Sequence, residues 1–445
     1  MVKNKFYEYN FGVTLCIMNS LAMMAHFSVF LVILLSIWTW IIPKKDMAYS
    51  FNYNCEELTY ADQIDIWPEP RKWSESLIED GKLKLRHYML NLNMSDYKNN
   101  LYYSIPKPKS LPAIHRKQDI GKKGVVMLVT KDSFKMAYSN IIMMRGFSNI
   151  SIEIYHYNEL TNPQQIVFAN MLNINVIDLK ELVFISHPIN YIKDKRNYQL
   201  KSAAMLASQF EDILFLDTDN IPVKDPYLFF DLPEYKQFGL ILWPDIWKTN
   251  PKNPVFKIFN TTCRNTWEIE AAQILVNKRK HFKSLLLAYH ILQDREFWFD
   301  VFFGDKDVMT YAATIAGLPF KVAPYFPSLV GYVDRLKGNF LFCGLVMLQR
   351  GFDGYPMFFH ANQVKYRGNV RKDSLDKIIM YKNGFQNHGL KGLLVDSSLG
   401  YGCTSIGERS PFKDTELEVK DTNQILGSFV DNWLELRQDL MAAWD

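Results

Sequence analysis

Short apolar runs that alternate with helical segments constrain the fold of this chain more than any other feature. The apolar runs are Gly124–Thr130, Ser151–His156, Asn175–Asp178 and Ile213–Leu216. The helical segments between them are Ser133–Met144, Pro163–Leu172 and Asn197–Phe210. Short runs of this kind, rich in β-branched residues, are typical of strands that are buried on both faces of a sheet. The alternation predicts an α/β fold with a Rossmann-like, mostly parallel sheet flanked by helices.

The segment Phe11–Ile42 contains no Asp, Glu, Lys or Arg. A membrane-spanning helix needs about 20 apolar residues, and this segment provides them. It is longer than the apolar core of a cleaved signal peptide, and no small-residue cleavage site follows it. We therefore expect a transmembrane signal anchor in the lipid bilayer at residues 11–42, after a cytoplasmic tail at residues 1–10. The flanking charges balance, so only the large mass after the span indicates its orientation.

The rest of the chain divides into two predicted parts. Residues 43–120 mix charges, prolines and aromatic residues without a clear period, which favours a stem followed by an N-terminal cap. Residues 121–445 form the predicted main domain, which is long enough to bury a large core. Apolar residues recur at helical spacing over Thr422–Trp444, so we expect one amphipathic helix there.

Charge and cysteine content exclude some classes of protein. The chain has 51 Lys and Arg against 47 Asp and Glu and no dense basic block, so a nucleic-acid partner is not expected. Four cysteines follow the predicted span: Cys55, Cys263, Cys343 and Cys403. This even number is compatible with disulfides in an oxidising lumen, with three alternative pairings, and equally with free thiols.

An apolar strand that ends in two aspartates is the most informative motif. Asp217 and Asp219 directly follow the run Ile213–Leu216. Ligands of open α/β sheets bind outside the carboxyl ends of the strands. Two carboxylates cannot be buried there unpaired without a large desolvation cost, and a divalent cation such as Mg²⁺ or Mn²⁺, shared with a diphosphate, would remove that cost. The alternatives are a solvated turn and a calcium loop, and Pro222 in place of glycine argues against the loop.

The segment Phe215–Pro226, FLDTDNIPVKDP, resembles the Asp-x-Asp segment of the fungal Golgi α-mannosyltransferases of glycosyltransferase family 71. Further segments resemble this family in the same order: Gly124–Thr130, Ile152–His156, Lys201–Phe210, Trp243–Asp245, Thr266–Lys278, Phe303–Asp307 and His360–Lys365. The likeness covers roughly residues 120–370. One departure is Ala271-Ala272, where the family usually has Ser-Gly, and it puts the family's acceptor preference in doubt.

The resemblance implies a GT-A type glycosyltransferase fold, GDP-mannose as the donor, Mn²⁺ as the cofactor and retention of the α configuration. It also implies a single-pass type II protein of the Golgi membrane with a luminal catalytic domain. The chemistry agrees, because a metal that bridges both phosphates acts as a Lewis acid on the leaving diphosphate. Asp219 is the predicted main metal ligand, Asp217 contacts the metal or the ribose, and His360 is a third ligand.

Other residues are predicted to contact the substrates. Lys201 and Lys365 would neutralise diphosphate oxygens, unless they are solvated surface cations. Trp243 and Asp245 would line the donor or acceptor pocket, because aromatic rings pack on sugar faces and carboxylates accept hydrogen bonds from hydroxyls. The alternative for Trp243 is an ordinary place in the core.

Asp305 and Glu270 are the candidate catalytic carboxylates. Asp305 would bind mannose hydroxyls or stabilise the anomeric cation. Double displacement would require one of the two as nucleophile, whereas a front-face reaction would require neither. Gln273 follows Glu270 by three residues on one face of a predicted helix, so both could address the acceptor. Asp307 would bind sugar, or would only cap the predicted helix Val308–Ala316.

These patterns together predict a retaining α-mannosyltransferase. It would move mannose from GDP-mannose to α-mannosides on glycoprotein glycans or cell-wall mannan, with α-1,2 linkage favoured over α-1,3. One alternative is a retaining transferase that uses another nucleotide sugar. The other is a catalytically silent glycan-binding subunit of a mannosyltransferase complex.

Overall fold

A computed structural model describes residues 74–90, 92, 123–182, 188–193, 195–262, 267–302, 304–336, 339–364, 370–381, 403–406 and 417–444. All of them belong to one compact unit, Tyr53–Asp445. The predicted cytoplasmic tail, membrane anchor and most of the stem lie outside the described residues. Within the described part of the chain, no helix is long and apolar enough to cross a membrane.

The first sheet has seven strands in the order β3-β2-β1-β4-β7-β6-β8. The strands are β1 (Lys123–Leu128), β2 (Ile152–His156), β3 (Ile174–Asp178), β4 (Asp212–Leu216), β6 (Leu240–Lys248), β7 (Trp267–Asn277) and β8 (Lys321–Val322). Strands β1 to β4 are parallel, whereas β7 runs antiparallel to both β4 and β6. The predicted α/β fold with a mostly parallel sheet is confirmed, and the four predicted strands correspond to β1–β4.

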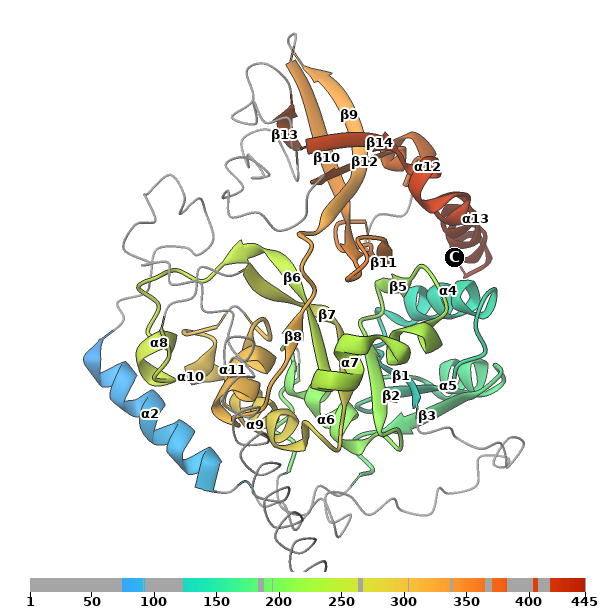
Figure 1. The fold of residues 1–445 in the computed structure, drawn as a ribbon. Helices are drawn as coiled ribbons and strands as arrows, with labels where there is room; N and C mark the ends of the chain where they lie inside the picture. The colour runs from blue at the N-terminus through green and yellow to red at the C-terminus, as the bar shows by residue number, and fades with distance from the viewer. Residues whose placement is uncertain are drawn as a thin grey trace, which may run out of the picture. The chain divides into compact units, whose positions relative to one another are not determined.

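Helices cover both faces of this sheet, which explains why its strands are mostly apolar (Figure 1). The connecting helices are α4 (Phe134–Arg145), α5 (Asn162–Ala169) and α6 (Gln199–Ala207), and two further helices are α9 (Phe282–Gln293) and α11 (Val308–Ile315). Val126 and Phe215 pack in one core cluster with residues of α6, α9 and α11. Val125 and Leu214, their neighbours along the strands, pack in a second cluster with residues of α4 and α5.

A second sheet is antiparallel and follows the order β14-β12-β9-β10-β11-β5, with β13 paired to β10. Its strands are β5 (Asn220–Pro222), β9 (Ser328–Leu336), β10 (Asn339–Arg350), β11 (Pro356–His360), β12 (Lys377–Tyr381), β13 (Cys403–Ile406) and β14 (Leu417–Asp421). Cys343 on β10 is disulfide-bonded, and Cys403 is its register partner on β13. The sequence analysis did not predict this sheet.

The N-terminal and C-terminal helices differ from the sequence-based expectation. Helix α2 (Glu75–Leu90) lies in the region predicted as stem and cap, where no period was recognised. Its Lys84 and Tyr88 side chains both bond Asp294, at 2.7 and 3.1 Å. The single helix predicted over Thr422–Trp444 is two helices, α12 (Thr422–Leu426) and α13 (Phe429–Trp444), because Gly427 interrupts it with a φ of 56°.

The remaining short helices lie in connections. They are η4 (Pro226–Asp231), α7 (Pro233–Phe238), α8 (Val255–Ile258), α10 (Arg295–Trp298) and η5 (Lys372–Leu375).

A substitution of Gly331 on β9 tests how closely the main chains of β9 and β10 approach each other. A Cβ at this position would lie 1.8 Å from the carbonyl oxygen of Cys343, which is main chain and cannot turn away. We expect Gly331→Ala to lower the free energy of unfolding by about 3 kcal/mol or more in urea denaturation. The control is Gly317→Ala, where φ is 67° and nothing lies within 4 Å of the new Cβ. Placing alanine in the left-handed backbone conformation should lower the stability of this control by about 1 kcal/mol. Equal losses of stability in the two variants would contradict the close pairing of β9 and β10.

Candidate active site

The carboxyl edge of the first sheet collects acidic side chains from three strands. Asp217 and Asp219 follow the end of β4. Because β7 is antiparallel to β4, its first residues lie at this same edge, and they include Glu270. Strand β6 ends there as well and carries Asp245, two residues beyond Trp243, the register partner of Glu270. The topology therefore gathers at one edge carboxylates that are up to 53 positions apart in the sequence.

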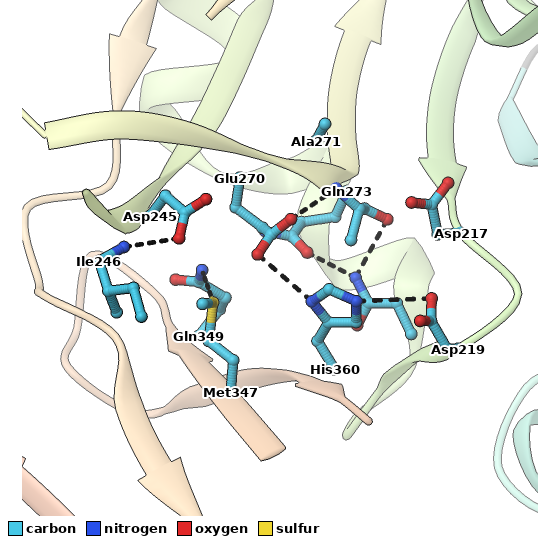
Figure 2. Close-up of polar contacts among 12 residues, drawn as sticks. Asp217, Asp219, Asp245, Ile246, Glu270, Ala271, Gln273, Met347, Gln349 and His360 are labelled. Atoms are coloured by element: carbon cyan, nitrogen blue, oxygen red, sulfur yellow. Dashed lines mark hydrogen bonds and ion pairs between the residues drawn. The ribbon is translucent and has the colours of Figure 1, made fainter. Parts of the chain in front are cut away.

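His360 reaches this edge from the second sheet. Strand β5 begins directly after Asp219 and pairs with β11, so that His360 is the register partner of Asn220. The imidazole Nε2 lies 3.4 Å from Asp219 Oδ1, and Nδ1 lies 3.3 Å from Glu270 Oε2. Figure 2 shows the ring between these two carboxylates. The structure thus brings together Asp219 and His360, two of the three predicted metal ligands.

Lys201 on α6 joins Asp217 to one further acid, Asp305. Its Nζ lies 2.8 Å from Asp217 Oδ2 and 2.7 Å from Asp305 Oδ2. It also donates to the main-chain oxygen of Ala271, at 3.4 Å. Asp217 is therefore directed to a lysine, and in Figure 2 its carboxylate lies apart from His360.

Lys306 is a third cationic side chain, after His360 and Lys201, that pairs with acidic groups at this edge. Its Nζ forms an ion pair with Asp245 Oδ2, and its charge also acts on Glu270. Three cations therefore face a larger number of carboxylates at this edge. The cations are Lys201, Lys306 and His360, and the carboxylates are Asp217, Asp219, Asp245, Glu270 and Asp305. When all of them are ionised, two negative charges remain uncompensated.

Burial and these pairs set the protonation states. Burial alone would raise the pKa of Glu270, but His360 and then Lys306 outweigh it and hold that pKa at about 2. Burial opposes the charge of His360, yet Glu270 and Asp219 raise its pKa to about 10. Burial raises the pKa of Asp217 to about 6, although Lys201 opposes this effect. The carboxylates of Glu270 and Asp219 therefore favour the protonated form of the His360 imidazole.

Trp243 has a predicted role but does not reach the site. Trp243 is fully buried, its Nε1 donates to the main-chain oxygen of Arg350 at 3.1 Å, and its ring packs edge-on against Phe358. It occupies the core and offers no exposed face to a sugar, so the pocket-lining prediction is corrected. Lys365 lies outside the described residues.

Glu270 and Gln273 lie on strand β7, whereas the sequence analysis predicted a helix at these positions. Pairing with β4 on one side and β6 on the other outweighs the helical preference of the Glu and Ala residues. Gln273 is fully buried, and its Oε1 accepts a hydrogen bond of 2.5 Å from Asn220 Nδ2. In this position it supports the acidic turn and has no exposed surface for an acceptor.

Asp307 precedes α11, as predicted, but its side chain neither caps the helix nor faces an open site. Its Oδ1 accepts the Ile269 N–H at 2.8 Å, and its Oδ2 accepts the Thr249 hydroxyl at 3.3 Å. The same hydroxyl lies 3.2 Å from Glu268 Oε1. Burial and the nearby Glu268 raise the pKa of Asp307 well above its usual value. The predicted sugar-binding role is therefore replaced by a buried link between β7 and α11.

Sequence reasoning missed some residues of this edge. Lys306 lies inside the recognised Gly-Asp-Lys-Asp motif, so the motif could have drawn attention to it. Asn140 on α4 donates from Nδ2 to the main-chain oxygen of Thr218, at 2.7 Å. Its Oδ1 accepts from Trp433 Nε1 on α13, at 3.3 Å. No local pattern marks Asn140, because both partners are distant in the sequence.

The donor set fits a divalent cation only in part. Among the described residues, no group of three or more His, Cys, Asp or Glu side chains is arranged to hold a metal ion. Asp219 and His360 converge, and Glu270 at His360 Nδ1 is the kind of outer partner that orients a metal-binding imidazole. Metal binding requires a neutral imidazole, so His360 would have to lose its proton, and the excess of two negative charges would then become three. A carboxylate, a neutral imidazole and this excess would suit a dication that takes its other ligands from a diphosphate.

The comparison with protein families is consistent with this chemistry. Residues 122–268 and 257–351 match the mannosyltransferase family Mannosyl_trans3, and together these matches cover just over half of the chain. An α/β fold with an acidic site at the carboxyl edge of its sheet fits the class of nucleotide-binding transferases. The chain belongs to the Mannosyl_trans3 family of mannosyltransferases. The match ends before His360.

Several fungal proteins are similar in sequence. Alpha-1,2-mannosyltransferase MNN24 of Candida albicans is 29% identical over 227 residues, which are 42% of this chain and 32% of the relative. Alpha-1,2-mannosyltransferase MNN2 of Saccharomyces cerevisiae is 26% identical over 229 residues, which are 40% of this chain and 38% of the relative. The chain thus spans well under half the length of these relatives.

Solved structures show a weaker likeness. Mouse xyloside xylosyltransferase 1 has a TM-score of 0.32 and 15% identity, covering 45% of this chain and 84% of that one. The mannosyltransferase Ktr4p from S. cerevisiae has a TM-score of 0.29 and 8% identity, covering 58% and 80%.

The buried Asp307 gives a pH-dependent prediction. A carboxyl group whose pKa is raised on folding stabilises the folded state at low pH, and this contribution is lost as pH rises through the folded pKa. Asp307→Asn keeps an acceptor for Ile269 N–H without an ionisable group. We expect the variant to gain stability over the wild type from pH 4 upward, by about 1.4 kcal/mol per pH unit until the folded pKa is reached.

Urea denaturation of both proteins at pH 5, 6, 7 and 8 measures this difference. Asp439→Asn, at an exposed position of α13, is the matched control and should show no trend with pH. A constant difference between Asp307→Asn and the wild type across this range would contradict the raised pKa of Asp307.

Proposed function

We propose that the protein transfers mannose from GDP-mannose to α-mannoside acceptors with retention of configuration. The observation that carries this proposal is the convergence of Asp219 and His360 in a cluster with two uncompensated negative charges. Such a cluster needs a dication, and a dication at a strand end is suited to a sugar diphosphate. Membership of a mannosyltransferase family supports mannose as the transferred sugar.

In this proposal Asp219 and His360 hold Mn²⁺, which supplies Lewis-acid stabilisation of the leaving diphosphate. Glu270 stays ionised through its contact with His360, so it can stabilise positive charge that develops on the sugar. Asp245, kept in place by Lys306, can accept hydrogen bonds from sugar hydroxyls. Glu270 and Asp305 both stay candidates for a nucleophile, and a front-face reaction stays the alternative.

The acceptor and the linkage are a finer part of the proposal. The names of the similar fungal proteins support α-1,2 transfer. Mannosylated glycoproteins or mannan are the acceptors that the sequence resemblance implies. Linkage analysis of the product formed on an α-mannobiose acceptor distinguishes α-1,2 from α-1,3 transfer. A second prediction from the sequence, use of another nucleotide sugar, is tested in the same assay by replacing GDP-mannose with UDP-sugars.

We also propose a single-pass type II location in the Golgi membrane with the catalytic domain in the lumen. The uncharged segment Phe11–Ile42 supports the membrane anchor. The disulfide at Cys343 supports an oxidising compartment, because such bonds are rare in the cytosol. Protease added to intact Golgi vesicles should leave the region after residue 42 undigested, and digestion without detergent would contradict this orientation.

The other alternative, a silent glycan-binding subunit, has less support. Five buried or half-buried carboxylates at one sheet edge are costly to desolvate, and a glycan-binding surface does not require such a cluster. Absence of transfer from every nucleotide sugar tested would favour this alternative.

Asp219→Ala tests the assignment of the site. The variant loses the carboxylate that faces His360, so the metal site keeps only one of its two converging protein ligands. We expect Mn²⁺-dependent transfer of labelled mannose from GDP-mannose to α-mannobiose to fall by about 100-fold or more.

Asp439→Ala is the control for this assay, because that carboxylate is exposed on α13 and makes no contact with the site. It should keep wild-type activity and wild-type metal dependence. Transfer by Asp219→Ala at the wild-type rate, with an unchanged Mn²⁺ requirement, would refute the assignment.

A further inference from the structure

The ammonium group of Lys201 is surrounded by protein oxygens. An ammonium group has three N–H donors. The Nζ of Lys201 has three oxygen neighbours: Asp217 Oδ2 at 2.8 Å, Asp305 Oδ2 at 2.7 Å and the main-chain oxygen of Ala271 at 3.4 Å. Two of its donors are hydrogen-bonded, to Asp217 and to Ala271, and its charge is also paired with Asp305 Oδ2, which accepts no hydrogen bond. A phosphate oxygen at Lys201 would therefore have to compete with two carboxylates for the same charge.

The surroundings of Lys201 favour lasting ion pairs with both Asp217 and Asp305, which together form a bridge between these two residues. The side chain keeps only 13% of its surface exposed, and the rings of Phe215 and Tyr198 lie 5.6 and 6.0 Å from Nζ. Burial opposes the charged form, but Asp217 and Asp305 more than compensate and raise the pKa of Lys201 above its usual value. A buried charge of this kind is strongly destabilising if its partner is removed.

The bridge joins segments that are far apart in the sequence. Asp217 follows β4, whereas Asp305 lies in the loop that enters α11. Within the described residues of that loop, Lys306 continues the same edge through its pair with Asp245. Lys201 thus fixes the acidic turn after β4 relative to the loop that carries two other charged groups of the site.

We propose that Lys201 is a positioning residue that locks Asp217 to Asp305, and that it does not bind the diphosphate of the donor. This inference rests on the proposed function, because it assigns a role within that site. It replaces the sequence-based expectation of a phosphate contact. The diphosphate charge is then left to the dication held at Asp219 and His360.

A double-mutant cycle tests this bridge. The variants are Lys201→Met, Asp305→Asn and the combination of both. The measurements are the melting temperature of the full-length protein and the dissociation constant of GDP in the presence of Mn²⁺. Lys257→Met is the matched control, because that lysine forms an ion pair with Glu75 in which both side chains are largely exposed.

Lys201→Met should lower the melting temperature by about 10 °C, because two buried acids lose their shared counter-ion. Adding Asp305→Asn should restore a large part of this loss, because one of the two acids is then neutral. The control should change little. The double variant should bind GDP within about threefold of Asp305→Asn alone, since Lys201 makes no contact with phosphate in this proposal.

The opposite pattern would overturn the proposal. If Lys201 binds the diphosphate, the double variant will bind GDP at least about tenfold more weakly than Asp305→Asn, because the cation is missing from both the bridge and the ligand. Equal melting temperatures of Lys201→Met and the wild type would also overturn it. Should Lys201→Met fail to fold, the comparison of the double variant with Asp305→Asn still decides the question.

The same measurements separate this inference from the proposed function. A wild-type protein that neither binds GDP nor transfers mannose would refute the proposed function. In that case the melting temperatures of the cycle would still show whether Lys201 and Asp305 are coupled.

Discussion

Neutralisation of acidic groups at one sheet edge is the constraint on which the rest of this structure depends. Carboxylates from β4, β6, β7 and the loop before α11 meet there, and like charges so close together are costly without counter-ions. Lys201 and His360 each join carboxylates from two different segments. Lys306 pairs with Asp245 and also lowers the pKa of Glu270. The cations therefore fix the relative positions of the segments as well as balancing charge.

The second sheet completes the site, because it brings in the histidine. Pairing of β11 with β5 places His360 beside the turn that begins at Asp217. The C-terminal helix α13 supports this turn from another side, through Trp433 and Asn140 to the carbonyl of Thr218. Both contributions come from residues beyond the family match, which ends at residue 351. We infer that the acidic turn is held by contacts from the whole unit rather than by its own sequence.

Strand β7 shows how a departure from the family pattern can be accommodated. Between β6 and β7 the register shifts near this edge, as in a β-bulge. The main-chain oxygens of Ala271 and Ala272 then accept bonds from Lys201, from the Asp217 N–H and from Asn220. Because these contacts use main-chain atoms, they do not require the Ser-Gly pair that the family usually has at these two positions.

The sequence by itself determined the α/β class, the four parallel strands and the position of the acidic turn. These features depend on local hydrophobic patterns, which the chain carries in short segments. It could not give the strand conformation around Glu270, the burial of Trp243 and Asp307, or the second sheet. Only the tertiary structure decided that His360 meets Asp219 and that Lys201 bridges Asp217 to Asp305. The reason is physical: these contacts join residues far apart in the chain, and strand pairing and burial override local preference.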